Sequence, residues 1–226
     1  MKNLLYNRNH DGGIIMGRFF SYLYGLLLTD GSLQKRNGKP IGFSLELSAK
    51  DSELIEKLHN KIPKSNIYYR ARNTNMCKNA ETVTLQFGKN ETFYTLLEMG
   101  FPLENKTERA TIPVTDYDEP SFWRGVLDGD GSLGLRANGD AFVSLTTKSE
   151  ELKKYFCIFL KGITGRNYNP SRNKRDSIYN IGCSTNSAKK VIDFLYHNIK
   201  DEDIYMDRKY KKMEEVLLKA NGGMPQ

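Results

Sequence analysis

Two carboxylates stand at matching places in two similar stretches of the chain. Residues 22–33 read YLYGLLLTDGSL, and residues 122–133 read FWRGVLDGDGSL. Asp30 and Asp130 hold the same place in the two runs and are 100 positions apart (130 − 30). One unit is therefore duplicated, and each half of the chain brings one acid.

Both runs are apolar and long enough for a helix that ends at the Asp-Gly pair. Small residues four apart share one helix face in each run, Gly25 with Thr29 and Gly125 with Gly129. If these faces pack together, the two acids meet at helix C-termini, where the macrodipole and the neighbouring carboxylate both oppose negative charge. Such a pair needs a cation, and an all-oxygen site completed by water suits Mg²⁺ better than zinc.

An apolar helix followed by Asp-Gly is common, but two copies at this spacing are not. The two runs resemble the signature motifs of the LAGLIDADG homing endonucleases in their single-chain, pseudo-symmetric form, and the resemblance covers nearly the whole chain. One departure is visible: the acid that often precedes the catalytic one by two positions is Asp128 in the second copy but Leu28 in the first. The catalytic pair is intact, and the departure concerns the buried part of the helix interface.

The resemblance implies a metal-dependent enzyme that hydrolyses one phosphodiester bond in each strand of a long, asymmetric double-stranded DNA site. Asp30 and Asp130 would hold Mg²⁺ or another divalent cation such as Mn²⁺. In the family the backbone carbonyl before each acid also binds metal, which corresponds here to Thr29 and Gly129. Metal would polarise the scissile phosphate and lower the pKa of the attacking water.

The resemblance also implies basic residues around the metal centre, which position water and offset phosphate charge. Lys106 and Lys209 are the first choice, because they lie in matching segments near the end of each half. Lys50 and Lys148 each precede an expected helix and are the second choice. One lysine is usually only surface charge, but repetition at equivalent places favours a function.

The hydrophobic pattern predicts an α+β fold of two pseudo-symmetric helix-hairpin-helix-hairpin-helix units with antiparallel sheets. The resemblance implies that these units are LAGLIDADG endonuclease-like and that their sheets form a DNA-binding saddle. Asn37-Gly38 and Asn138-Gly139 are typical of hairpin turns between alternating strands. A second hairpin is expected in each half. Helical spacing of apolar residues predicts helices over 18–29, 51–62, 90–99, 121–129 and 149–163.

Composition divides the chain into five segments. Residues 1–17 contain several Asn and a Gly-Gly pair, and residues 112–120 contain two prolines and several acids, as irregular segments do. The predicted organisation is an N-terminal arm 1–17, a first unit 18–111, a linker 112–120, a second unit 121–220 and a disordered tail 221–226.

The solvent-facing side of each sheet is the expected DNA-binding surface, because a two-stranded ribbon can enter the major groove. Polar residues on an exposed sheet are usually only hydrated, but a mixture of Arg, Gln and Ser over several strands suits base edges. The expected DNA-binding residues are Gln34, Arg36, Ser44, Glu46, Ser48, Lys50, Tyr68, Arg70, Arg72, Gln86, Arg136, Lys148, Arg166, Arg172, Lys174 and Arg175.

Charge and composition agree with an anionic partner. The net charge is +7, and the 3 cysteines form no metal-ligand pattern, which indicates reduced thiols in an intracellular protein. The apolar run 19–28 is too short to span a bilayer, so a soluble protein without a membrane partner is expected. The single-chain form that the sequence resembles implies a monomer. The 3 histidines are scattered and form no nuclease cluster.

Two other functions use the same scaffold in the family. One is an intron RNA maturase, which needs a basic surface rather than paired acids. The other is a DNA-binding regulator that no longer cleaves, for which loss of one or both acids is expected. Retention of Asp30 and Asp130 favours cleavage.

Overall fold

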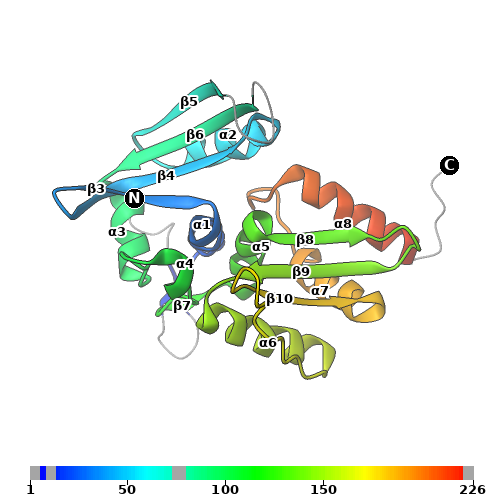
Figure 1. The fold of residues 1–226 in the computed structure, drawn as a ribbon. Coiled ribbons are helices and arrows are strands. Elements are labelled where there is room, and N and C mark those ends of the chain that lie inside the picture. The colour runs from blue at the N-terminus through cyan, green and yellow to red at the C-terminus, as the bar shows by residue number, and fades with distance from the viewer. Residues whose placement is uncertain (1–5, 9–13, 73–79, 221–226) are drawn as a thin grey trace.

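Two helices packed against each other form the centre of the protein, which the computed structural model describes over residues 6–8, 14–72 and 80–220. They are α1 (Arg18–Thr29) and α5 (Glu119–Asp130), and a β-sheet lies on each side of the pair (Figure 1). Helix α5 begins two residues before the predicted start at 121. The Asp118 carboxylate caps it by accepting from the Ser121 N–H at 3.0 Å, and Pro120 fits the first turn.

The backbones of α1 and α5 touch at two glycines. A Cβ atom at Gly25 would lie 2.3 Å from the carbonyl oxygen of Phe122, and one at Gly125 would lie 2.1 Å from the carbonyl oxygen of Tyr22. No side chain fits at either place, so glycine is required by the close approach rather than by its backbone angles. The two small-residue faces predicted from the sequence do pack together.

The first sheet is antiparallel, with strands in the order β3-β4-β6-β5. The turn between β3 and β4 has positive φ at Asn37 (50°) and Gly38 (74°), as the Asn-Gly pair predicts. Helix α2 covers the apolar face of this sheet, and α3 packs against α1. The elements are β3 (Gly31–Arg36), β4 (Lys39–Ser48), α2 (Ser52–Lys61), β5 (Ser65–Arg72), β6 (Ala80–Gly88), α3 (Glu91–Glu98) and α4 (Lys106–Arg109).

The second sheet is also antiparallel, with strands in the order β10-β9-β8. Helices α6 and α7 pack against it and against each other, and α8 packs along β8. The elements are β8 (Gly131–Leu135), β9 (Ala141–Thr147), α6 (Glu150–Thr164), β10 (Tyr179–Ser184), α7 (Thr185–Tyr196) and α8 (Asp207–Ala220).

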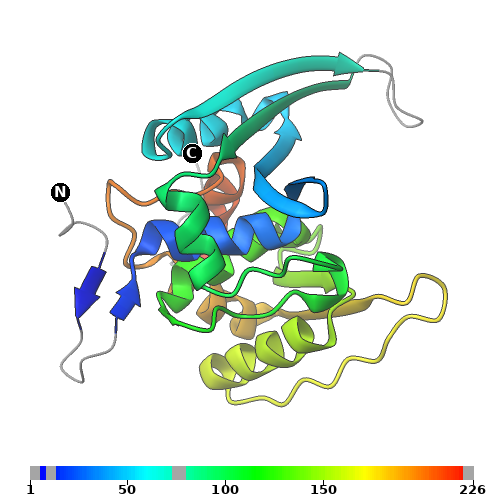
Figure 2. The same ribbon diagram turned by 90° about the vertical axis from the view of Figure 1, so that its left-hand side faces the viewer.

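The fold class predicted from the sequence, α+β with antiparallel sheets, is confirmed. The prediction of a second hairpin in the second half of the chain is wrong. Residues 166–178, all described, form no strand beyond a single bridge between Arg172 and Tyr179, and β10 pairs only with β9. Figure 2 shows this segment as a long open loop after α6, drawn in yellow. Residues 171–177 read SRNKRDS, so an apolar face that could hold a strand on the core is missing, and Pro170 cannot donate to a ladder.

Two further strands lie in the segment predicted as an N-terminal arm. Strand β2 (Ile14–Met16) pairs with β1 (Tyr6–Arg8) and, in parallel, with β7 (Asp116–Tyr117) from the predicted linker. The division into an arm, two units and a linker stays a prediction, and the tail 221–226 lies outside the described residues. Within the described ranges, every helix is too short or too polar to cross a membrane.

The glycine contact predicts how the protein responds to single methyl groups. Gly25→Ala or Gly125→Ala should lower the free energy of unfolding by about 1–3 kcal/mol, because the added Cβ overpacks a backbone contact. Urea unfolding followed by circular dichroism measures the change.

Gly162→Ala in α6 is the matched control. A Cβ there would meet nothing within 4 Å among the residues that the structure describes, so alanine should stabilise the helix by about 0.5–1 kcal/mol. An unchanged urea midpoint in Gly25→Ala would show that the two helices are not in backbone contact.

Candidate metal centre and nucleic-acid interface

Asp30 and Asp130, here called the carboxylate pair, stand at the adjoining ends of α1 and α5. Asp30 Oδ2 lies 3.0 Å from the place that a Cβ at Gly129 would take, so the carboxylate of α1 reaches the end of α5. Burial raises the pKa of Asp30 to about 6, and the charge of Asp130 adds to the rise. Burial also raises the pKa of Asp130. Both side chains still open to solvent, so the pair can accept a cation that relieves their repulsion.

Lys106 caps the end of α1. Its Nζ donates to the carbonyl oxygens of Leu27 at 3.3 Å, Thr29 at 2.5 Å and Gly31 at 2.5 Å. The last carbonyls of a helix lack partners within the helix, and a lysine can satisfy them. Burial lowers the pKa of Lys106, against the charges of the carboxylate pair. The ammonium group is therefore fixed beside the two acids.

Lys209 does the same for α5. Its Nζ donates to the carbonyl oxygens of Leu127, Asp128 at 2.7 Å and Gly131 at 2.9 Å. Lys209 is only 4% exposed, whereas Lys106 is half-buried, and burial lowers the pKa of Lys209 to about 8. The structure thus places the two lysines selected from the sequence at equivalent positions, with Lys209 the more deeply held.

The donors at this centre fit Mg²⁺ or Mn²⁺, because all of them are oxygen atoms. The donors predicted from the sequence are the carboxylate pair and the carbonyls of Thr29 and Gly129. The Thr29 carbonyl already accepts from Lys106, so a metal ion there would share that oxygen or displace the ammonium group. Across the described ranges no three His, Cys, Asp or Glu gather as a metal site, so further ligands would be carbonyls, water or a bound phosphate.

Asp128 makes the two halves different. It is 1% exposed, and its Oδ2 accepts from the Tyr22 hydroxyl at 2.7 Å and from the Met206 N–H at 2.9 Å. Burial raises its pKa to about 6, against the opposing charge of Lys209. Its Oδ1 has no hydrogen-bond partner among the described residues. Leu28 holds the equivalent place in α1, so the buried carboxylate that accepts from Tyr22 and Met206 has no copy in the first half.

The helix that carries Lys209 is tied to the first half of the chain by ion pairs. Arg208 Nε lies 2.8 Å from Asp51 Oδ1, and Lys57 Nζ lies 2.8 Å from Asp207 Oδ1. Asp51 and Lys57 belong to the α2 region, so α8 rests on the covering helix of the opposite half. Sequence reasoning missed these pairs, because charges some 150 residues apart carry no local signal.

The outer face of the first sheet carries the polar residues expected there. The register places Gln34, Ser44, Glu46, Ser48, Tyr68, Arg70 and Gln86 on the face opposite the buried Phe43, Leu45 and Leu85. Arg36 is exposed beyond a register shift in β3, and Lys50 is exposed just after β4. Arg72 is the last residue of β5 and pairs with Ala80, and the structure describes only its backbone.

The second sheet presents fewer of the expected residues. Arg136 lies over the Phe142 ring, 5.8 Å from its centroid, and Lys148 is exposed after β9. The other four predicted residues, Arg166, Arg172, Lys174 and Arg175, are exposed on the irregular segment rather than on a strand.

The sequence analysis did not select the residues on the outer face of this sheet. The alternation of apolar and polar residues over 141–147 could have indicated Ser144 and Thr146. On the outer face of β9 and β10, Thr146 Oγ1 donates to Asn180 Oδ1 at 2.9 Å. Ser144 pairs with Ser132 and Gly182 across the three strands.

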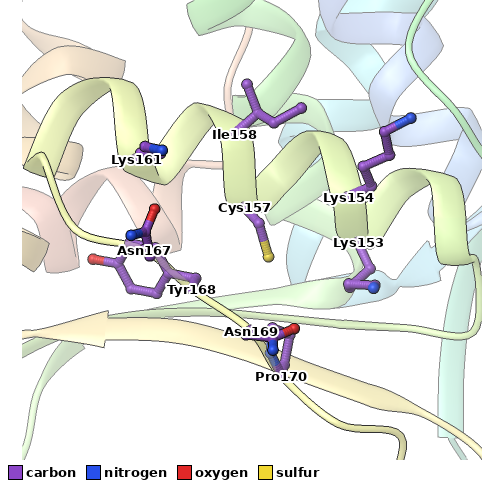
Figure 3. Close-up of a pocket in the computed structure, with 9 residues that line it drawn as sticks. All are labelled: Lys153, Lys154, Cys157, Ile158, Lys161, Asn167, Tyr168, Asn169 and Pro170. Carbon is purple, nitrogen blue, oxygen red and sulfur yellow. The ribbon is translucent and has the colours of Figure 1, made fainter.

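A hollow of about 250 Å³ lies elsewhere in the second half, between α6 and residues 167–170. Figure 3 shows Cys157 and Lys153 directed from the helix towards Asn169. Lys153 is already paired with Glu150 at 2.5 Å, and none of the residues that line the hollow is buried. It is a surface depression between a helix and a loop, apart from the carboxylate pair.

Comparison with known proteins identifies the fold. Residues 119–195 match the family model of the LAGLIDADG-like domain. None of the curated proteins compared with the sequence matches it.

Three solved structures are similar over most of the chain. The homing endonuclease I-WcaI bound to its DNA recognition sequence has 18% identity and a TM-score of 0.55, with 85% of this chain and 86% of that chain covered. The LAGLIDADG homing endonuclease I-GzeII in complex with its DNA target has 12% identity and a TM-score of 0.51, with 91% of each chain covered. A variant of I-DmoI in complex with its target DNA in the presence of Mg has 15% identity and a TM-score of 0.53, with 80% of this chain and 97% of that chain covered. The protein therefore has the fold of the LAGLIDADG homing endonucleases, with a LAGLIDADG-like domain over residues 119–195.

Proposed function

We propose that this protein is a site-specific homing endonuclease that uses divalent metal to hydrolyse one phosphodiester bond in each strand of a long, asymmetric DNA site. The observation that carries the proposal is the meeting of Asp30 and Asp130 at the ends of two close-packed helices, with a fixed lysine beside each. One acid and one lysine come from each half. Two strand cuts need this twofold supply.

Each group at the centre has a separate task. Asp30 and Asp130 hold and orient the cation, whose bound form supplies Lewis-acid activation of the scissile phosphate. Lys106 and Lys209 offset the charge of the phosphate, and their carbonyl partners keep them from swinging into solvent. Burial raises the pKa of both acids, and the charge of Asp130 adds to the rise at Asp30, so a bound cation would offset the cost of holding two ionised carboxylates there.

The sheets and the charge of the chain support duplex DNA as the substrate. The outer face of the first sheet is rich in Gln, Arg and Ser, and the net charge is +7. Similar structures were solved with DNA targets, one of them in the presence of Mg. A monomer would suffice, because one chain carries both acids. A role as an intron RNA maturase or a non-cleaving DNA-binding regulator would not need the carboxylate pair.

Removal of either acid tests the reaction. Asp30→Asn or Asp130→Asn should reduce Mg²⁺-dependent double-strand cleavage by roughly two to four orders of magnitude, because the side chain keeps its size but loses the charge that holds metal. Binding to duplex DNA should persist. Cleavage of a target selected from a random library, in Mg²⁺ and after chelation, gives the measurement.

Asp193→Asn is the control, because this exposed acid on α7 makes no side-chain hydrogen bond or ion pair among the described residues. It should cut like the parent. A break rate within a few fold of the parent in either Asp30→Asn or Asp130→Asn would remove the pair from catalysis.

Replacement of the lysines separates turnover from affinity. Lys106→Met and Lys209→Met should slow single-turnover cleavage by ~10²-fold with little change in Kd. Lys209→Met should also lower the unfolding free energy by about 1–3 kcal/mol, because two buried carbonyls and one partly buried carbonyl lose their donor. Urea unfolding measures the loss of stability. Cleavage rates measured in buffer without urea, where each variant is folded, measure the loss of catalysis.

Lys50→Met and Lys148→Met are the matched pair, because both lysines are exposed and precede α2 and α6 rather than capping α1 and α5. They should weaken binding and reduce the salt slope by about one unit each. Slower single-turnover cleavage in these two but not in Lys106→Met and Lys209→Met would mean that the roles are reversed.

Salt dependence and competition test the partner. The logarithm of the association constant should fall linearly with the logarithm of salt concentration, by about 0.9 for each phosphate contacted on duplex DNA. Fluorescence anisotropy with labelled duplex measures this slope. A flat response would exclude nucleic acid as the main partner, and tighter binding to structured RNA than to duplex DNA would favour the maturase role.

A further inference from the structure

A hollow of about 250 Å³ opens on the outer face of the first sheet. The residues that matter around it are Gln34, Ile41, Gly42, Asn66, Gln86 and Gly88. Its volume is smaller than the roughly 300–1,000 Å³ of the pockets that enclose a small molecule. A hollow of this kind suits the edge of a larger ligand that lies across the sheet.

Two facing glycines create the hollow. Gly42 of β4 pairs with Gly88 of β6, so neighbouring strands lack side chains at the same level of the outer face. A Cβ at Gly42 would lie 2.3 Å from the Phe87 carbonyl oxygen, so no larger residue fits there without moving the backbone. The second half has no copy of this feature. The position equivalent to Gly42 is occupied by Phe142, which pairs with Gly134 as Gly42 pairs with Gln34.

Three amide side chains surround the glycine floor. Gln86 pairs with Asn66 on one side and with Ser44 on the other, and Gln34 pairs with Gly42. None of the three amides has a hydrogen-bond partner within the described part of the chain. Gln86 is half-buried on an inner strand and has the least freedom, whereas Gln34 and Asn66 are exposed on the edge strands.

We infer that this hollow receives the major-groove edge of an A·T base pair and that Gln86 reads the adenine. The inference rests on the proposed function, in which DNA lies across the sheets. A glutamine amide can donate to adenine N7 and accept from adenine N6, and an apolar side chain can contact the thymine methyl group. Ile41, 39% exposed at the rim, offers that apolar contact. Gln34 and Asn66 complete the polar wall.

The position of the hollow restricts the base pair to one part of the target. Gln34 follows Asp30 by four residues along β3, so at ~3.3 Å per residue it lies about 13 Å from the carboxylate pair. That length corresponds to roughly four steps along duplex DNA. The adenine preference should therefore lie within about five base pairs of the cut, on one side of the target only.

Gln86→Glu gives a directional test. Glutamate keeps the size of the side chain but only accepts hydrogen bonds, so preference at one position should change from adenine to cytosine, whose N4 amino group donates. The measurement is equilibrium binding to a randomised duplex library, without metal and then with Mg²⁺ to score cleavage. The adenine-to-cytosine ratio at that position should fall by roughly tenfold or more, while ratios at other positions stay unchanged.

Asn60→Asp, on the exposed side of α2, adds the same charge away from the sheet and should leave every base ratio unchanged. If the parent selects a defined site and Gln86→Glu leaves every base ratio unchanged, the assignment of Gln86 is overturned. The proposed nuclease function is not affected by that result. A parent that binds a defined site but cuts nothing in Mg²⁺ would overturn the nuclease and leave the base-reading test valid. A parent that selects no site would overturn both.

Discussion

The contact between the backbones of α1 and α5 determines where every other functional part lies. Because Gly25 and Gly125 lack side chains, the helices approach until carbonyl oxygens occupy the space of the missing Cβ atoms. Each helix leads directly into a strand, at Gly31 and at Gly131. The distance between helix ends therefore sets both the separation of the carboxylates and the placement of the two sheets.

The electrostatics at the helix ends follow from the same contact. Two acids near each other in partly buried surroundings are each harder to ionise, as the raised pKa of Asp30 shows. Lys106 and Lys209 bring positive charge to the same place, and helix carbonyls that would otherwise lack donors hold them. The centre thus combines acids that gain from a cation with lysines whose ammonium groups are already oriented.

The two halves support this centre by different means. In the second half, Asp128 holds the N-terminus of α8 through the Met206 N–H, and Arg208 pairs with Asp51 of the first half. In the first half, Leu28 replaces the buried acid, and the segment after Lys106 is held through the Ala110 carbonyl, which accepts from Ser149. If the protein acts as proposed, this unequal support and the unequal sheet faces would let its two halves meet different DNA sequences.

The sequence by itself determined the repeated helices, the paired acids and most of the hairpins, because these depend on local spacing. Apolar residues at helical or alternating positions report which face is buried, and Asn37-Gly38 reports a turn whatever lies around it. The α+β class follows from that order of elements. Lys106 and Lys209 could be selected from the sequence because they lie in matching segments of the two halves, and both contact the ends of the central helices.

Only the tertiary structure decided which distant residues meet. Residues 166–178 leave the sheet because their polar side chains gain nothing from burial on its core, a comparison that needs the rest of the sheet. Asp51 meets Arg208, and Asn66 joins Gln86 beside a pair of glycines, through strand order and helix packing. Such contacts arise from the packing of elements far apart in the chain, and periodicity describes only the burial of each element by itself.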